Sequence, residues 1–299
     1  MADSSRSTAL AVGGAAALTW GLTGTFIKLL PAFTAIEVLA LRIMTALALA
    51  LCLCLVKPQL LTKAYKLVRQ PLGILLSSLM VFYYLFAVRA FQLAPVSDVA
   101  LVVGLSPILG LTFKAITGKP LSRGETIGAL MAFIGLFLFV LPRLQSTTGD
   151  RTTYVTGLLF ALLAACVSLG YATLFRQQSS RHSSIDPVVV AFTTFVVGTV
   201  VVLPIAIATS PLLMVKATAD LRTIAIVLGL GIISTVVPTF CYSYAAKYLS
   251  PILTTALNLL TPIFAAAIAA VFLGELLPVV SILGAILVFT GIFLISGTP

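Results

Sequence analysis

Long runs of apolar residues, separated by short polar stretches, extend along the whole chain. A run of about 20 apolar residues forms a helix roughly 30 Å long, which is enough to cross the hydrocarbon core of a bilayer. The separating stretches are too short for a soluble domain, and the most polar of them are 57–70, 143–153, 176–186 and 208–221. The pattern predicts an all-α polytopic membrane protein with ten transmembrane helices, at 8–29, 36–56, 72–93, 97–117, 124–142, 154–175, 187–207, 222–245, 251–273 and 278–296.

The ninth predicted helix, within Pro251–Glu275, is interrupted by a proline in its interior. Pro262 has no N–H to donate to the carbonyl of Asn258, so the sequence predicts a kink and a free backbone acceptor at membrane depth. Thr254, Asn258 and Thr261 recur at helical spacing and share one face. A helix surrounded by lipid alone has no use for such a polar face.

The same pattern occurs earlier in the chain. The segment 95–118 also begins with a proline, and it carries Ser106-Pro107 where the later segment carries Thr261-Pro262. Glycines follow the two segments at matching intervals, namely Gly118, Gly128 and Gly135 after the first and Gly274, Gly284 and Gly291 after the second. We interpret the chain as two repeats of five helices, 1–145 and 152–299. Because five is odd, the second repeat enters the membrane from the opposite side, which gives an inverted repeat of the kind found in secondary transporters.

The composition excludes several classes of function. The chain is 60% hydrophobic and 9% charged, whereas a soluble domain carries roughly 25% charged residues. The net charge of +10 is spread over short loops rather than gathered on one face, so we expect no nucleic-acid partner. The four cysteines lie in apolar segments and the single histidine, His182, lies in a polar stretch. This distribution predicts no metal site, no cofactor and no catalytic residues, and it argues against an enzyme.

The basic residues in the loops and toward the ends of the predicted helices indicate the orientation. With the N-terminus inside, most of these lysines and arginines fall on the cytoplasmic side, as the positive-inside rule requires. At equivalent places after the two broken helices, Lys119 falls inside and Glu275 outside. An even number of helices then makes both termini cytoplasmic.

Several short motifs, in order and at fitting spacing, resemble the drug/metabolite transporter superfamily, and specifically its ten-helix EamA-type members. The motifs are Thr19-Trp20-Gly21 with Lys28, Glu37 to Arg42 (EVLALR), Tyr83-Tyr84 to Ala94, Ser106-Pro107, and Thr261-Pro262 with Phe272 to Glu275. The first repeat departs from the family pattern at Thr117 to Lys119, and Ser168 stands where a tryptophan is usual. The resemblance implies a central cavity between the halves, no cofactor, and a function like that of bacterial amino-acid exporters, the aromatic exporters being nearest.

Five residues are predicted to line that cavity: Trp20, Tyr83, Tyr171, Tyr242 and Asn258. Each also has a purely structural interpretation. A tryptophan this deep in a helix packs against other helices or forms a cavity wall, and a buried tyrosine hydroxyl or amide needs a partner, either another helix or a solute.

The backbone breaks at Pro107 and Pro262 are predicted to act in gating and to offer the carbonyls of Val103 and Asn258 to an ammonium group. Asp98, in the fourth helix, is a candidate for gating or a proton role. The other charged residues near helix ends are expected to snorkel or to pair locally, namely Glu37, Arg42, Arg89 and Glu275. A solute carboxylate would then meet hydroxyls and the Asn258 amide only.

The leading hypothesis is a plasma-membrane (bacterial inner-membrane) transporter that exports or facilitates the movement of amino acids and related small amphiphilic metabolites by alternating access. Its partners are the solute and the lipid bilayer, with no obligatory protein partner. One alternative is a non-transporting structural membrane protein whose polar faces only join helices. Another is a phosphate-ester or nucleotide-sugar carrier, which ranks low because phosphate recognition normally uses Arg or Lys and we expect no cation near the middle of any helix.

Overall fold

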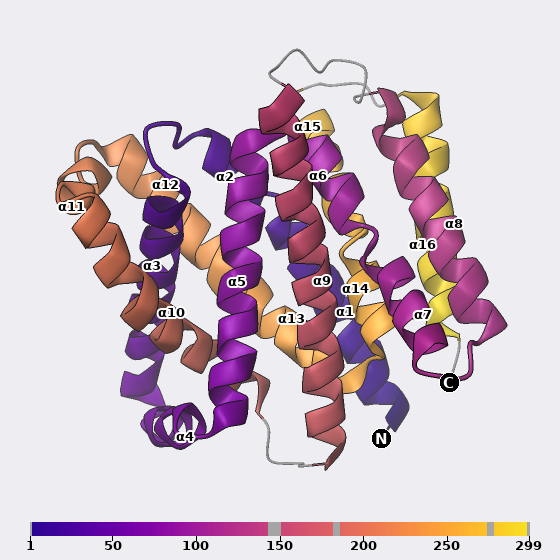
Figure 1. Ribbon diagram of the computed structural model, residues 1–299, viewed down its shortest axis with the longest axis horizontal. Helices are drawn as coiled ribbons and strands as arrows, with labels where there is room; N and C mark the ends of the chain where they lie inside the picture. Colours follow the sequence, from indigo (N-terminus) through magenta and orange to yellow (C-terminus); the bar gives the residue numbers. More distant parts are fainter. Residues whose placement is uncertain (1, 143–150, 182–185, 274–277, 298–299) are drawn as a thin grey trace.

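The structure is a computed structural model that describes residues 2–142, 151–181, 186–273 and 278–297 (Figure 1). Over these ranges the chain folds into helices joined by short connections, without a β-strand. The first half contains α1 (Ala2–Trp20), α2 (Thr23–Lys28), α3 (Ala35–Val56), α4 (Gln59–Val68), α5 (Pro71–Leu93), α6 (Val96–Val103), α7 (Ser106–Ile116) and α8 (Arg123–Val140). The second half contains α9 (Arg151–Arg181), α10 (Pro187–Thr209), α11 (Leu213–Ala217), α12 (Leu221–Gly231), a π-helical turn η2 (Ile232–Val236), α13 (Val237–Tyr248), α14 (Pro251–Leu257), α15 (Leu260–Leu273) and α16 (Val279–Ser296).

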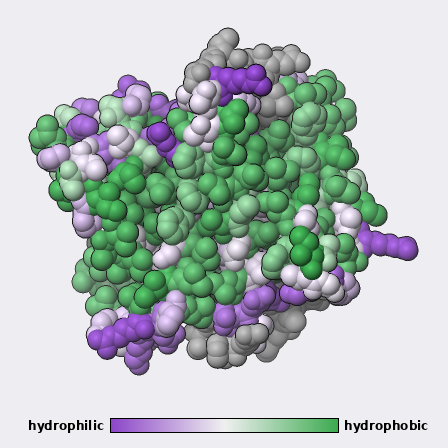
Figure 2. All heavy atoms as spheres, in the orientation of Figure 1, coloured by the Kyte–Doolittle hydropathy of each residue, from purple (hydrophilic) through white to green (hydrophobic). Residues whose placement is uncertain are grey.

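The length and composition of the helices are those of a polytopic membrane protein. Within the described residues eight helical segments are long and apolar enough to cross a bilayer, and Pro251–Ala265 is a shorter apolar helix. Hydrophobic side chains cover the middle of the molecular face in Figure 2, and hydrophilic side chains gather along its upper and lower edges. A band of this kind is what a bilayer requires of a protein surface.

The tightest helix crossing joins α8 to α16, which stand side by side in Figure 1. A Cβ placed on Gly128 would lie 2.6 Å from the carbonyl oxygen of Gly291, and one placed on Gly135 would lie 2.6 Å from that of Gly284. Only glycine lets two backbones approach this closely. Four of the glycines that the sequence repeats at matching intervals, Gly128, Gly135, Gly284 and Gly291, therefore meet across one interface.

Two helices are broken in the middle of their span, and the form of the break differs from the predicted kink. α6 ends at Val103 and α7 begins at Ser106, with Pro107 in the first turn of α7; Asn258 and Leu259 likewise separate α14 from α15. Proline is tolerated in a first turn because the N–H groups there have no helical partner in any case.

The carbonyls at these breaks are not free, contrary to the prediction. The Ser106 hydroxyl donates a hydrogen bond to the carbonyl oxygen of Val103 (2.6 Å), and the backbone N–H of Thr261 donates to that of Asn258 (3.0 Å). A tight turn and a short hydroxyl side chain therefore satisfy the acceptors that the prolines release.

The segment from α12 to α13 contains the π-turn η2, followed by Pro238. Pro238 lacks the N–H that would reach back to the carbonyl of Ser234. The π-turn widens the chain locally and leaves the Ser234 carbonyl available to another helix, while the Thr235 hydroxyl donates to the Leu230 carbonyl (2.7 Å). Turns of this type occur frequently at functional sites.

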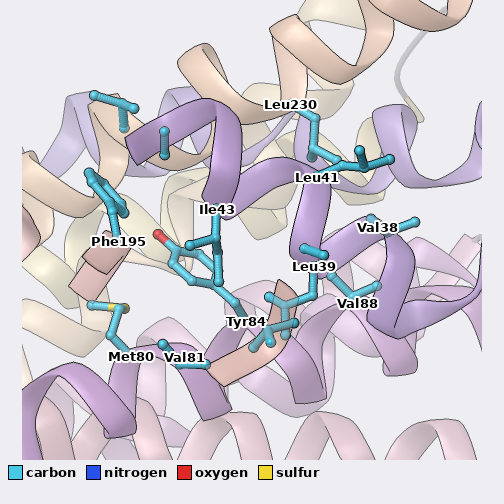
Figure 3. Packing of buried hydrophobic residues seen from close by; sticks show 14 of the residues in the cluster. Val38, Leu39, Leu41, Ile43, Met80, Val81, Tyr84, Val88, Phe195 and Leu230 are labelled. Atoms are coloured by element: carbon cyan, nitrogen blue, oxygen red, sulfur yellow. The ribbon is translucent and has the colours of Figure 1, made fainter. Parts of the chain in front are cut away.

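The larger buried cluster joins α3, α5, α10 and η2 (Figure 3). Tyr84 of α5 lies among Leu39 and Ile43 of α3, and its hydroxyl bonds Thr239 of α13.

Glu37 caps α3 together with Thr34 and forms a 3.0 Å ion pair with Lys216, so the expected local pairing of this carboxylate is confirmed.

Two predicted loops contain helices. The stretch 57–70 holds α4, whose Lys63 and Lys66 alternate with apolar positions, and the stretch 208–221 holds α11. The prediction missed both because a short amphipathic helix at a membrane surface is too polar to register as a spanning segment. His182 and Glu275 lie outside the described residues.

Candidate functional site

A cavity opens where the two broken helices meet α1, α2, α3 and α5. The centre of a water molecule fits in about 50 Å³ of it, and the empty volume is about 540 Å³ when the space open to the outside is included. Its walls come from both halves of the chain, and the lining residues are Trp20, Thr23, Arg42, Tyr83, Tyr84, Ala87, Phe91, Ala100, Val103, Asn258, Thr261 and Pro262. Ligand sites in helical membrane proteins are commonly built at such helix breaks.

An aromatic cluster forms one wall. The Trp20 ring lies 5.5 Å from the Tyr83 ring and 5.1 Å from the Tyr242 ring, measured between centroids, and Tyr171 stacks behind Tyr242 at 5.9 Å. Four of the residues singled out from the sequence thus come together in one cluster. Of these four, Trp20 and Tyr83 line the cavity, whereas Tyr171 and Tyr242 form the layer behind it.

The hydroxyls of that second layer are already engaged. Tyr171 and Ser243 share a hydrogen bond of 2.6 Å, and Tyr242 and Ser168 share one of 2.8 Å. Both bonds join α9 to α13. This geometry favours the helix-joining interpretation for these two hydroxyls, which leaves the rings as support for Trp20.

Polar atoms without partners gather around the cavity. Asn258 is the C-terminal cap of α14, and it is 9% exposed. Neither its Nδ2 nor its Oδ1 has a hydrogen bond of normal geometry in the described part of the chain, although the amide lies near the Tyr242 hydroxyl. Two more buried atoms have no hydrogen bond of normal geometry, namely Trp20 Nε1, which lies near the Tyr84 hydroxyl, and Thr23 Oγ1. Buried polar groups are costly when unpaired, so a cluster of them marks a place where a polar solute or water binds.

Arg42 is the residue that the sequence interpretation misplaced. It was expected to snorkel, but it is fully buried about 10 Å along α3, and its guanidinium lies over the Tyr84 ring at 4.1 Å from the centroid. Nε donates to Thr235 Oγ1 (2.9 Å) and Nη2 donates to the Ser234 carbonyl (2.9 Å). Nη1 has no partner among the described residues.

The physical reason for the error lies on another helix. Pro238 frees the Ser234 carbonyl, and η2 presents that oxygen together with the Thr235 hydroxyl to α3. The guanidinium therefore finds protein acceptors inside the bundle and has no need to reach the membrane surface. The expectation that no cation lies deep in a span is wrong for Arg42. A proline four residues after a small polar residue in a long apolar segment was the signal that pointed to this acceptor.

Pro262 lines the cavity, whereas Pro107 and Asp98 lie outside its lining. Asp98 is 2% exposed in the first turn of α6 and accepts a 2.9 Å hydrogen bond from the Tyr154 hydroxyl of α9. The carboxylate thus has a partner at the α6–α9 interface. The residues that the structure describes contain no group of three His, Cys, Asp or Glu side chains arranged for a metal ion.

Comparison with known proteins gives the family. Residues 8–141 and 155–297 each match the EamA-like transporter family. A protein of Archaeoglobus fulgidus described as an "Uncharacterized transporter" is 23% identical over 207 residues, which cover 69% of each chain. A "Probable terminal-alkyne amino-acid exporter" of Streptantibioticus cattleyicolor is 26% identical over 205 residues, which cover 68% of this chain and 64% of that protein.

A solved crystal structure has the same fold, with a TM-score of 0.76 and 21% identity over 97% of this chain and 96% of the other. The family match covers nearly all of the chain, in agreement with the motifs and with the apolar helices. The chain belongs to the EamA-like transporter family of the drug/metabolite transporter superfamily, and its activity is membrane transport.

Proposed function

We propose that this protein moves amino acids and related small amphiphilic metabolites across the plasma membrane by alternating access, in the direction of export. The observation that carries the proposal is the cavity at the helix breaks, where an aromatic wall faces unpaired polar atoms. An amphiphilic solute needs both features. The name of the Streptantibioticus cattleyicolor relative supports an amino acid as the solute.

Alternating access requires two halves that rock against each other, and we propose that the repeats 1–145 and 152–299 are these halves, each with five spanning helices and inverted in the membrane. The contacts support this symmetry. Gly128 and Gly135 are the repeat counterparts of Gly284 and Gly291, and the close pairs are Gly128 with Gly291 and Gly135 with Gly284. A two-fold axis relating the halves demands this reciprocity.

The other helix pairs follow the same rule. α5 packs on α9, and α13, the counterpart of α5, packs on α1, the counterpart of α9. α3 packs on its own counterpart α10. α7 packs on α14, and their counterparts α15 and α6 pack on each other. The cytoplasmic placement of both termini is part of the proposal. The Arg6 guanidinium donates to the Ser296 carbonyl, and the start of α1 and the end of α16 both lie in the lower half of Figure 1.

Within the cavity, the Trp20 and Tyr83 rings would receive the apolar part of the solute, and the Asn258 amide would bind its polar part. Tyr171 and Tyr242 would hold Trp20 in place. The breaks preceding Pro107 and Pro262 would serve as the points at which the fourth and ninth spans bend during the transition.

The test compares Trp20→Ala and Asn258→Ala with the wild type in proteoliposomes that take up radiolabelled L-phenylalanine. Each variant is expected to transport roughly tenfold more slowly or with a correspondingly higher KM, because it loses a contact of about 1–2 kcal/mol. Phe82→Ala is the control, since Phe82 is the neighbour of Tyr83 on α5 but is 50% exposed and lies outside the cavity lining.

Thermal stability must be measured on the same preparations. If both cavity variants are folded and show wild-type kinetics for a panel of amino acids, the solute binds elsewhere. If the wild type moves no solute but retains a stoichiometric protein partner through purification, the rival hypothesis of a structural membrane protein is correct.

A further inference from the structure

We propose that Arg42 binds the carboxylate of the transported solute and so restricts the cavity to solutes that carry a single carboxylate. This inference rests on the proposed function, because it assigns a specificity-determining residue to the same cavity. It replaces the expectation that a carboxylate would meet only hydroxyls and the Asn258 amide.

The first argument is the unfilled donor capacity of the guanidinium. Arginine offers five N–H donors in a planar fork. Nε and Nη2 are held by Thr235 and Ser234, and these two bonds fix the plane of the group. Nη1 is the nitrogen left without a partner, and the residue lines the cavity. The plane of the fork is therefore fixed in advance, and Nη1 is the donor that remains for a solute in this cavity.

The second argument is the missing counter-ion. Among the described residues, the lining of the cavity contains Arg42 and neither Asp nor Glu. Glu37, one turn and a half earlier on α3, is paired with Lys216, and Asp98 accepts a bond from Tyr154. A buried cation without an anion is unfavourable in low dielectric, and the Tyr84 ring compensates only a part of the charge. An entering anion would remove this penalty.

The third argument is the match to a single carboxylate. Trp20 Nε1 and Asn258 Nδ2 are two further donors without partners on the same cavity. One guanidinium and two neutral donors suit a monoanion with two acceptor oxygens. A phosphate monoester, which carries close to two charges, would leave about one charge uncompensated inside the bundle.

The experiment uses the wild-type protein and four probes with a common ring: L-phenylalanine, L-phenylalaninamide, 3-phenylpropionate and phenyl phosphate. Each probe is titrated as a competitor of radiolabelled L-phenylalanine uptake and as a ligand in thermal unfolding of the purified protein. L-phenylalanine and 3-phenylpropionate are expected to bind roughly 10–100-fold more tightly than the amide, the range of a charge-assisted hydrogen bond. Equal binding of acid and amide overturns the proposal, and so does tighter binding of phenyl phosphate.

The variants assign that preference to one residue. Arg42→Gln removes the charge and is expected to lose the preference for acid over amide, while its affinity for the amide stays within about twofold of the wild type. Arg89→Gln is the matched control, since Arg89 lies outside the cavity lining, and it should retain the preference. Should Arg42→Gln fail to fold, Arg42→Lys keeps the charge but loses the fork, and a reduced preference in that variant supports the proposal.

The outcomes distinguish the proposed transport function from the proposed role of Arg42. If the wild type transports amino acids but binds the acid and the amide equally, the proposed function stands and the proposed role of Arg42 is refuted. If folded Arg42→Gln or Arg42→Lys protein shows the same ratio of acid affinity to amide affinity as the wild type, the proposed role of Arg42 is also refuted. A wild type that binds none of the four probes refutes the proposed role of Arg42, and one that also moves no other amino acid of a panel refutes the proposed function.

Discussion

The crossing of α8 and α16 gives the sharpest prediction for stability. In Gly135→Ala the new Cβ would lie 2.6 Å from the Gly284 carbonyl oxygen and 2.7 Å from the Val288 nitrogen. Ordinary contact begins near 3.4 Å, so the two backbones must separate by about 1 Å. Because the obstructing atoms are backbone rather than flexible side chain, the strain cannot be relieved by a rotamer change.

Overpacking of this kind costs about 1–3 kcal/mol. On the scaling known for soluble proteins, the midpoint temperature of unfolding in detergent is therefore expected to fall by roughly 3–10 °C for Gly135→Ala. Gly284→Ala should behave in the same way, because its Cβ would lie 2.5 Å from both the Gly135 carbonyl oxygen and the Phe139 nitrogen.

Gly170→Ala is the matched control. Gly170 lies inside α9, and a Cβ there would meet nothing within 4 Å. Alanine in a helix interior is favoured over glycine by about 1 kcal/mol, so the control should unfold at the wild-type temperature or above it. If Gly135→Ala and Gly170→Ala unfold at the same temperature, α8 and α16 do not cross as described, and the reciprocal contacts lose their value as support for two-fold symmetry.

Three further predictions concern topology, coupling and the second layer of the site. In a version lacking the four native cysteines, single cysteines replacing Ser4 and Thr298 should be protected from an impermeant maleimide in intact cells; labelling of either one from outside would reverse the topology. A pH gradient alone should not drive solute accumulation, because the cavity lining contains no Asp, Glu or His; accumulation that Asp98→Asn abolishes while exchange persists would contradict this. Tyr171→Phe should lower stability by about 1 kcal/mol through loss of its bond to Ser243 and leave solute affinity unchanged, as checked by thermal unfolding and competition.

The helices and their apolar faces were predictable from the sequence because a bilayer imposes a simple rule of length and composition. The two breaks were also predictable, since Pro107 and Pro262 cannot continue a helix. The sequence alone does not show which group satisfies the carbonyl oxygen that each proline releases. Whether a freed carbonyl stays free depends on whether a nearby hydroxyl or turn reaches it, as Ser106 does for Val103.

The site was partly predictable for a related reason. Trp20, Tyr83 and Asn258 stand out as large or polar groups deep in apolar segments, and all three line the cavity. Arg42 looked like an ordinary charge near a helix end, because its environment is made by η2, far away in the sequence. Distance to a helix end measures depth in the membrane only for a side chain that faces lipid.

The most direct test of the account is the flux of radiolabelled L-phenylalanine into proteoliposomes preloaded with unlabelled L-phenylalanine, in parallel for wild type, Asn258→Ala and protein-free vesicles. Exchange requires only a solute site reachable in turn from both sides, so it is independent of the energy source. We predict saturable exchange in the wild type that is at least about tenfold slower in Asn258→Ala. Wild-type vesicles that exchange no faster than protein-free vesicles, for L-phenylalanine and for every other amino acid of a full panel, would contradict the central claim.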